Sequence, residues 1–327
     1  KTDSTGNYQW HKLYLPRVEE KGRGSNMYSV LQASDGGYLI SGSVAMNPTG
    51  PKGPKGLWSD VLLARTDANG NPLWAYSYGS NGPDEAFASV ESGDGGYVLA
   101  GAYSPSGDRS ASDVLLLKVD LNGVKQWAKT FGGSGISSAK SVLRTSDGGF
   151  ALVAKTDAHG AGGIDILLAK TDKYGQLEWA HTLGASGDDD PSILLQTSDG
   201  GFLITGDTTS FGDYKKDALI MKTDGAGKLQ GARTFGGEAE DAGFSAIEVG
   251  RDSYIVVGMT ESYGAGKQDI FTVQLQDPDS LGDCLQSVQP SLKALEIDSS
   301  DPALDEGEIE LFYQSDSLRK QRAVDIQ

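Results

Sequence analysis

Short apolar stretches separated by Gly- and Asp-rich turns recur along the chain at a regular interval. One stretch in each unit opens with an Asp, and successive copies of it are 53, 52, 52 and 52 residues apart (Asp60, Asp113, Asp165, Asp217 and Asp269). A regular period of this size is typical of a propeller or solenoid, in which one structural unit stacks on copies of itself. We therefore expect a single large repeat domain with one continuous core.

Four apolar stretches in each unit are predicted to be β-strands. In the third unit they span 141–145, 150–155, 165–172 and 177–183. Asp-Gly-Gly separates the first two and Asp-x-x-Gly separates the last two. Both sequences favour tight hairpins, because Gly accepts positive φ angles and Asp can bond its own backbone. Four short antiparallel strands per unit, with no helical periodicity, are typical of a propeller blade.

The two ends of the repeat region complement each other. Residues 8–14, YQWHKLY, match the fourth strand of a blade, whereas residues 244–276 supply a first, second and third strand without a fourth. We therefore predict an all-β, five-bladed β-propeller over residues 1–276, closed by an N-terminal strand that completes the last blade.

Two repeated side chains are predicted to hold the blades together. A Trp occupies the fourth strand in four of the five units (Trp10, Trp74, Trp127 and Trp179), and Gly231 replaces it in the other. We expect the Trp rings to pack between adjacent blades. The strand-opening Asp residues are expected to bond backbone amides or a hydroxyl of the next blade, because five carboxylates converging on one axis would repel one another.

The amino-acid sequence of the repeat resembles that of a known family. The sequences WAKTFGGSG, SDGG followed by Phe or Tyr, and Asp-apolar-Leu-apolar-Lys-Thr-Asp-x-x-Gly are similar to the bacterial β-propeller repeats of secreted and cell-surface proteins, called SBBP repeats, over residues 1–276. The resemblance implies a secreted or cell-surface location and a binding or structural role. It implies no particular activity, since propellers serve many functions.

Composition narrows the function classes. The net charge of −17 and the pI near 4.5 argue against nucleic acid as a partner, because Lys and Arg must neutralise phosphates in such complexes. No apolar run has the length of a membrane helix. The single cysteine, Cys284, excludes an intrachain disulfide and a Cys-based zinc site.

The longer, variable loops are predicted to lie on the face opposite the tight turns, where a propeller usually binds its ligands. One loop carries Trp58, a candidate ligand contact. Acidic residues precede the innermost strands and are candidates for binding a sugar or calcium: Asp84, Glu85, Asp188, Asp189, Asp190, Glu238, Glu240 and Asp241. Calcium is the one candidate ion, at Asp188, Asp189 and Asp241. The alternative is that these acids are solvated charges and turn caps. No catalytic residue or other cofactor is assigned, because no His lies in a nucleophile motif.

Residues 277–327 form a different, acidic segment rich in Asp, Glu, Ser and Pro. Its two apolar alternations, 292–297 and 308–314, are candidates for strands of a small further element or for strands that add to another subunit's sheet edge. We expect a noncatalytic extracellular or cell-surface propeller for adhesion, assembly or carbohydrate binding, with other subunits or surface glycans as partners and self-assembly through 277–327. The alternative is a glycan-active enzyme that uses the loop-face acids.

Overall fold

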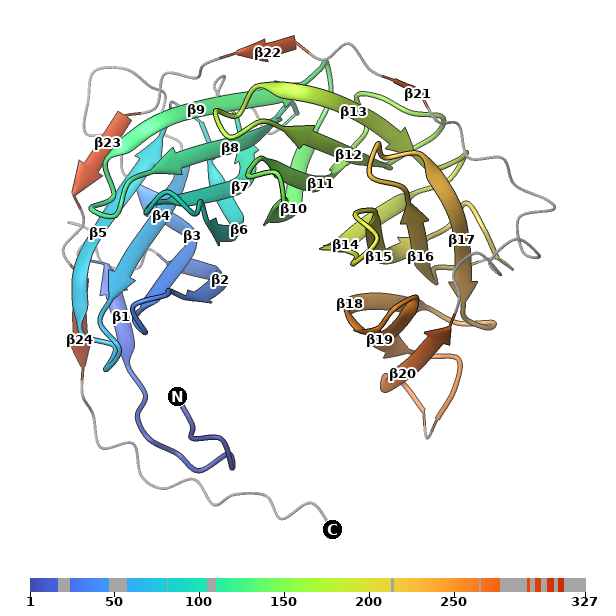
Figure 1. The fold of residues 1–327 in the computed structure, drawn as a ribbon, viewed down its shortest axis with the longest axis horizontal. Helices are drawn as coiled ribbons and strands as arrows, with labels where there is room; N and C mark the ends of the chain where they lie inside the picture. Colours follow the sequence, from blue (N-terminus) through green and yellow to red (C-terminus); the bar gives the residue numbers. More distant parts are fainter. Residues whose placement is uncertain are drawn as a thin grey trace.

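A computed structural model shows an all-β protein whose sheets follow one another around an arc (Figure 1). It describes residues 1–16, 24–46, 58–80, 82–104, 110–212, 215–264, 266–276, 293–294, 298–300, 305–308 and 311–314. Within these ranges, no helix that could cross a membrane is found.

Five antiparallel sheets, each built from consecutive strands, make up the repeat region. The first four have four strands each and are β2 (Ser25–Gln32), β3 (Tyr38–Met46), β4 (Trp58–Thr66) and β5 (Pro72–Gly79); β6 (Glu85–Glu91), β7 (Tyr97–Tyr103), β8 (Asp113–Val119) and β9 (Lys125–Gly132); β10 (Ser137–Arg144), β11 (Phe150–Thr156), β12 (Asp165–Thr171) and β13 (Leu177–Leu183); β14 (Asp189–Gln196), β15 (Phe202–Thr208), β16 (Asp217–Thr223) and β17 (Leu229–Phe235). The fifth contains β18 (Asp241–Gly250), β19 (Ser253–Thr260) and β20 (Asp269–Gln276). The first strand of each sheet lies on the inner side of the arc (Figure 1).

The core lies between consecutive sheets. All seven residues of β12 are buried, because its alternate side chains face the two neighbouring sheets. Between the second and third sheets, Val98 and Leu116 pack in one cluster with Phe150 and Leu167. Each sheet therefore depends on its neighbours for its stability.

Tight turns join the strands in the way that their sequences predict. Gly148 has a φ of 88°, and its N–H donates to the carbonyl of Thr145 at 2.9 Å, which closes the hairpin between β10 and β11. At the next hairpin, one carboxylate oxygen of Asp172 accepts from the amides of Tyr174 and Gln176, both at 2.8 Å. Both hairpins of a sheet lie at the same end of its strands.

The predicted closure by residues 8–14 is absent from this structure. Within the described residues β20 pairs only with β19, and β1 (Leu13–Pro16) pairs instead with β24 (Leu311–Gln314). A physical reason lies at the start of the chain. Asp3 forms the same kind of turn as Asp172. Just before this turn, Thr2 pairs with Tyr8 in the same register in which Thr66 pairs with Pro72. Residues 1–3 thus already provide the end of a third strand for Tyr8.

Strands after residue 276 line the outside of the arc. They run past the sheets in reverse order, and their pairs are β21 (Lys293–Ala294) with β13, β22 (Asp298–Ser300) with β9, β23 (Asp305–Glu308) with β5, and β24 with β1 (Figure 1). These strands add to sheet edges of the same chain. The rest of 277–327, including Cys284, lies outside the described residues.

Candidate functional site

Each innermost strand carries a β-bulge at the same repeat position. The pairing register shifts by one residue there, so one side chain per sheet has no partner in the ladder: Tyr28, Phe87, Lys140, Ser192 and Phe244. A bulge re-aims the side chain it carries and is often found next to a functional site. The inner side of the arc therefore displays a row of five side chains, of four types, on one repeated backbone.

Three of these bulge side chains lie close to one another. The rings of Tyr28 and Phe87 have centroids 4.8 Å apart. The ammonium of Lys140 lies 5.9 Å from the centroid of Phe87, which is within the range of a cation–π contact. An aromatic face beside an ammonium group can bind a ligand that has both an apolar surface and a polar or negative group.

A cavity of about 330 Å³ opens between the second and third sheets beside this row. Its lining combines Glu85 and Phe87 of β6 with Ser138 and Lys140 of β10 and with Lys155 near the end of β11. The cavity therefore combines an aromatic side chain, two ammonium groups and a carboxylate in its lining. Its volume is at the lower end of the range for small-molecule sites.

The acids predicted to bind a ligand fall into two groups, and the first is buried. Asp84, Asp189 and Asp241 each accept a backbone amide from four residues earlier and a second group from the loop after the second strand. The donors to Asp84 are Ser80 N (2.6 Å) and Ser104 N (3.0 Å). Those to Asp189 are Ala185 N (2.9 Å) and Ser210 Oγ (2.7 Å), and those to Asp241 are Gly237 N (3.1 Å) and Ser262 Oγ (2.6 Å). Burial raises the pKa of Asp84 to about 6. These carboxylates organise turns between sheets.

The second group is more accessible but dispersed. Glu85 lines the cavity, whereas Asp188 and Glu240 are exposed, and Asp188 accepts the amide of Ile164 at 2.9 Å. Asp190 and Glu238 do not line the cavity either. Throughout the described ranges, no three acidic, His or Cys side chains are grouped to hold a metal ion, so Asp188, Asp189 and Asp241 do not form the expected calcium site.

Trp58 is the first residue of β4, and the loop before it lies outside the described residues. The strand-opening acids, Asp60, Asp113, Asp165, Asp217 and Asp269, stand on the third strand of each sheet, away from the inner side of the arc. Asp165 accepts the amide of Ala161, in its own sheet, at 3.0 Å. Its pKa is raised to about 6, first by burial and further by the charges of Asp189 and Asp188. Asp165 therefore bonds a backbone amide, one of the two expected kinds of donor, and this amide lies in the loop before its own strand.

The four tryptophans contact the following sheet. Trp127 and Trp179 lie 6.3 and 6.0 Å, between ring centroids, from Phe150 and Phe202, and Trp10 lies 5.8 Å from Tyr38. Trp74 packs into the cluster between the first and second sheets, and its Nε1 donates to the carbonyl of Leu121 at 3.0 Å. These side chains connect sheets and do not line the cavity beside Lys140.

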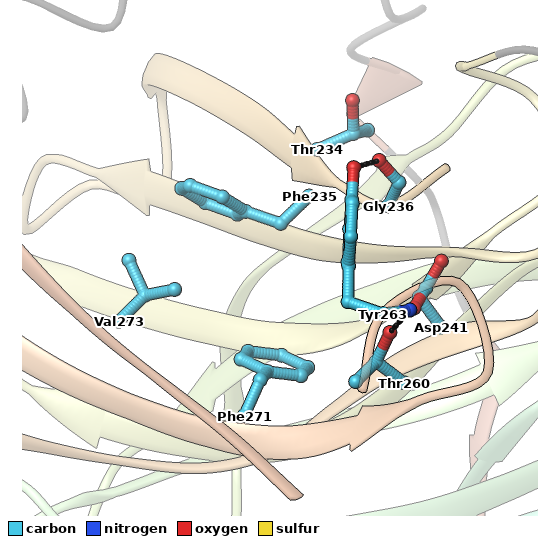
Figure 2. Close-up of a pocket in the computed structure, with 8 residues that line it drawn as sticks. All are labelled: Thr234, Phe235, Gly236, Asp241, Thr260, Tyr263, Phe271 and Val273. Carbon is cyan, nitrogen blue, oxygen red and sulfur yellow. Dashed lines mark hydrogen bonds between the residues drawn. The ribbon is translucent and has the colours of Figure 1, made fainter. Parts of the chain in front are cut away.

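A second cavity, of about 290 Å³, lies between the fourth and fifth sheets (Figure 2). Phe235, Phe271 and Val273 provide its apolar wall, and the hydroxyl of Tyr263 donates to the carbonyl of Gly236 at 2.9 Å across it. In the third unit, the counterparts of the apolar wall are Leu183, Leu167 and Ala169, all fully buried. This cavity is therefore the space left where the fifth sheet has no fourth strand.

Sequence reasoning missed Phe87, Lys140 and Lys155, because a single residue at a bulge or at a cross-strand position carries no motif. Aligning the five repeats would have exposed them as positions where the residue type changes from unit to unit. No protein-family model matches the chain, and no curated protein is similar to it.

Proposed function

We propose that this protein is a noncatalytic extracellular or cell-surface propeller that binds carbohydrate. The observation that carries the proposal is the cavity beside Phe87, where an aromatic ring, two lysines, a glutamate and serine hydroxyls converge. A sugar has an apolar face of C–H groups that packs on an aromatic ring, and hydroxyls that both donate and accept hydrogen bonds. The resemblance to SBBP repeats supports the proposed location.

The proposal includes a closed ring of five blades in solution. The fifth sheet leaves Ile270 87% exposed, whereas its counterpart Ile166 is fully buried. At the other end of the arc Val30 is 69% exposed, whereas its counterpart Val142 is 8% exposed. Contact between these two ends would bury both apolar faces, as it does at every other boundary between sheets.

Two other roles have weaker support. A glycan-active enzyme needs two accessible carboxylates at a set separation. Asp84, Asp189 and Asp241 are buried and hydrogen-bonded within turns, and of the more accessible described acids only Glu85 lines the cavity. Assembly through residues 277–327 needs free strands, but the described strands of that segment already pair with sheets of the same chain.

A glycan array tests the proposal. We expect the protein to retain one or more glycans, with and without a calcium chelator, because the described residues form no calcium cluster. Phe87→Ala is expected to abolish retention, whereas Phe244→Ala, at the same bulge of the fifth sheet, leaves it unchanged. If the unmodified protein retains no glycan, the proposal fails.

A further inference from the structure

The five sheets provide an internal comparison of equivalent positions. One position of the second strand is always aromatic, as in Tyr38, Tyr97, Phe150, Phe202 and Tyr254. In contrast, the inner cross-strand pairs differ in every sheet: Asn26 with Ser43, Glu85 with Ala102, Ser138 with Lys155, Asp190 with Asp207 and Ala242 with Met259. The bulge residues also vary, although Phe occurs at this position in both the second and the fifth sheets. The backbone is thus repeated, whereas the chemistry of the inner surface changes from sheet to sheet.

The third sheet is the one that presents cations at these varied positions. Both its bulge residue, Lys140, and its cross-strand residue, Lys155, are lysines, and both line the cavity. Their ammonium groups face the same space as Phe87 and Glu85. Two cations at neighbouring variable positions give this cavity a different charge from the rest of the inner surface.

These two lysines lack the acidic partners that other lysines have. Lys118, Lys170 and Lys222 bond carboxylates at 2.8, 2.6 and 2.8 Å. Neither Lys140 nor Lys155 has a carboxylate within ion-pair distance in the part of the chain that the structure describes. The chain has 45 acidic and 28 basic residues, yet these two partly buried lysines form no ion pair with any described acid.

The described acids nearest to these lysines do not form ion pairs with them. Asp207 is held by Lys216 at 2.9 Å and interacts with Lys140 only at longer range. Asp190 lies near Asp207, in the fourth sheet. Glu85 lies on the wall opposite the lysines, where it receives the hydroxyl of Ser59 at 3.4 Å. Glu85 is thus placed to accept a hydrogen bond from a ligand hydroxyl.

We infer that the cavity between β6 and β10 binds a sugar unit that carries a carboxylate, of the uronic acid type. Lys140 and Lys155 bind the carboxylate, Phe87 packs against the apolar face of the ring, and Glu85 with Ser138 bonds the hydroxyls. The volume of about 330 Å³ suits one or two sugar rings. This inference rests on the proposed carbohydrate-binding function and names its ligand class.

Calorimetric titration with trigalacturonic acid and with its fully methyl-esterified form tests the inference. The ester keeps the sugar rings and hydroxyls but removes the negative charges. We expect the acid to bind at least about tenfold more tightly than the ester. Lys140→Met and Lys155→Met, which keep an unbranched apolar stem but remove the ammonium group, are expected to reduce the affinity for the acid to that for the ester. Lys173→Met, at an exposed turn, is the matched control and leaves both affinities unchanged.

The outcomes distinguish the assignment of an acidic sugar from carbohydrate binding itself. Equal affinity for acid and ester, or an unchanged affinity for the acid in both lysine variants, overturns the assignment of an acidic sugar while leaving carbohydrate binding in place. Binding of neither trisaccharide, combined with an empty glycan array, overturns carbohydrate binding itself.

Discussion

Carboxyl groups of two kinds recur from sheet to sheet. The Asp of each Asp-Gly-Gly turn in the first four sheets bonds a cation of the third strand, as in the pair between Asp147 and Lys170. The hydrogen bond from Lys170 lowers the pKa of Asp147 to about 2. Burial raises the pKa of Asp199, but the hydrogen bonds from Lys222 and Thr197 outweigh it and hold that pKa at about 2. Asp84 and Asp165 have the opposite shift, since the pKa of each is raised to about 6, mainly by burial.

These opposite shifts predict a maximum of stability near pH 4. The ordinary pKa of these groups is 3.8. Asp147 and Asp199 stabilise the fold above that value, and their contribution is lost as the pH falls towards about 2. Asp84 and Asp165 keep their protons in the folded state up to a pH of about 6, so the free energy of unfolding falls as the pH rises from about 4 to about 6.

Urea unfolding followed by Trp fluorescence, at low protein concentration from pH 2 to 8, measures this profile. The double variant Asp84→Asn/Asp165→Asn should flatten only the limb above pH 4. A stability maximum at neutral pH would contradict the prediction.

At the level of elements, the docking of one sheet on the next depends on a Trp and a Gly. The ring of Trp127 covers Gly175, so that a Cβ on this glycine would lie 2.7 Å from Cζ3 of the ring. The same contact joins Trp10 to Gly70, Trp74 to Gly123 and Trp179 to Gly227. Gly231 replaces the Trp ahead of the one unit in which the Asp and Gly positions of this turn are occupied by Gln276 and Asp279. The absence of this Trp therefore has a local reason.

A double-mutant cycle tests this contact. Gly175 has a φ of 75° and lies under the Trp127 ring, whereas Gly200 has a φ of 86° with no atom near its Cβ position. We expect Gly175→Ala to cost at least about 1 kcal/mol more than Gly200→Ala, which loses only the backbone preference. Trp127→Ala alone should cost about 3 kcal/mol. In the Trp127→Ala background, the extra cost of Gly175→Ala should disappear; strict additivity in chemical denaturation would show that the ring and the glycine are independent.

At the scale of the whole molecule, the sequence predicts the repeat better than the ends. Strands and turns could be assigned because Asp-Gly-Gly and Asp-x-x-Gly have local physical preferences that all units share. Closure of the ring could not be predicted, because residues 1–3 and β20 compete for the same edge of the strand predicted over residues 8–14. The candidate site was also hidden, since Lys140 and Lys155 acquire their role only when two sheets bring them beside Phe87.

Ile270 distinguishes an open arc from a ring that closes in solution. The Ile270 side chain is 87% exposed in the open arc. If the arc stays open, Ile270→Asp should therefore change the free energy of unfolding by less than about 0.5 kcal/mol. If the ring closes, Ile270 becomes buried as Ile166 is, and the charge should cost about 3 kcal/mol or more. We expect the larger cost for Ile270→Asp and a similar cost for Val30→Asp at the other end of the arc. The double variant should cost less than the sum of the two single variants, since both substitutions act on the same contact between the ends. Leu121→Asp, on an exposed turn, is the control with little effect. Closure within one chain also makes these costs independent of protein concentration, whereas burial by a second copy would make them depend on it; small effects at both ends would leave the protein an open arc.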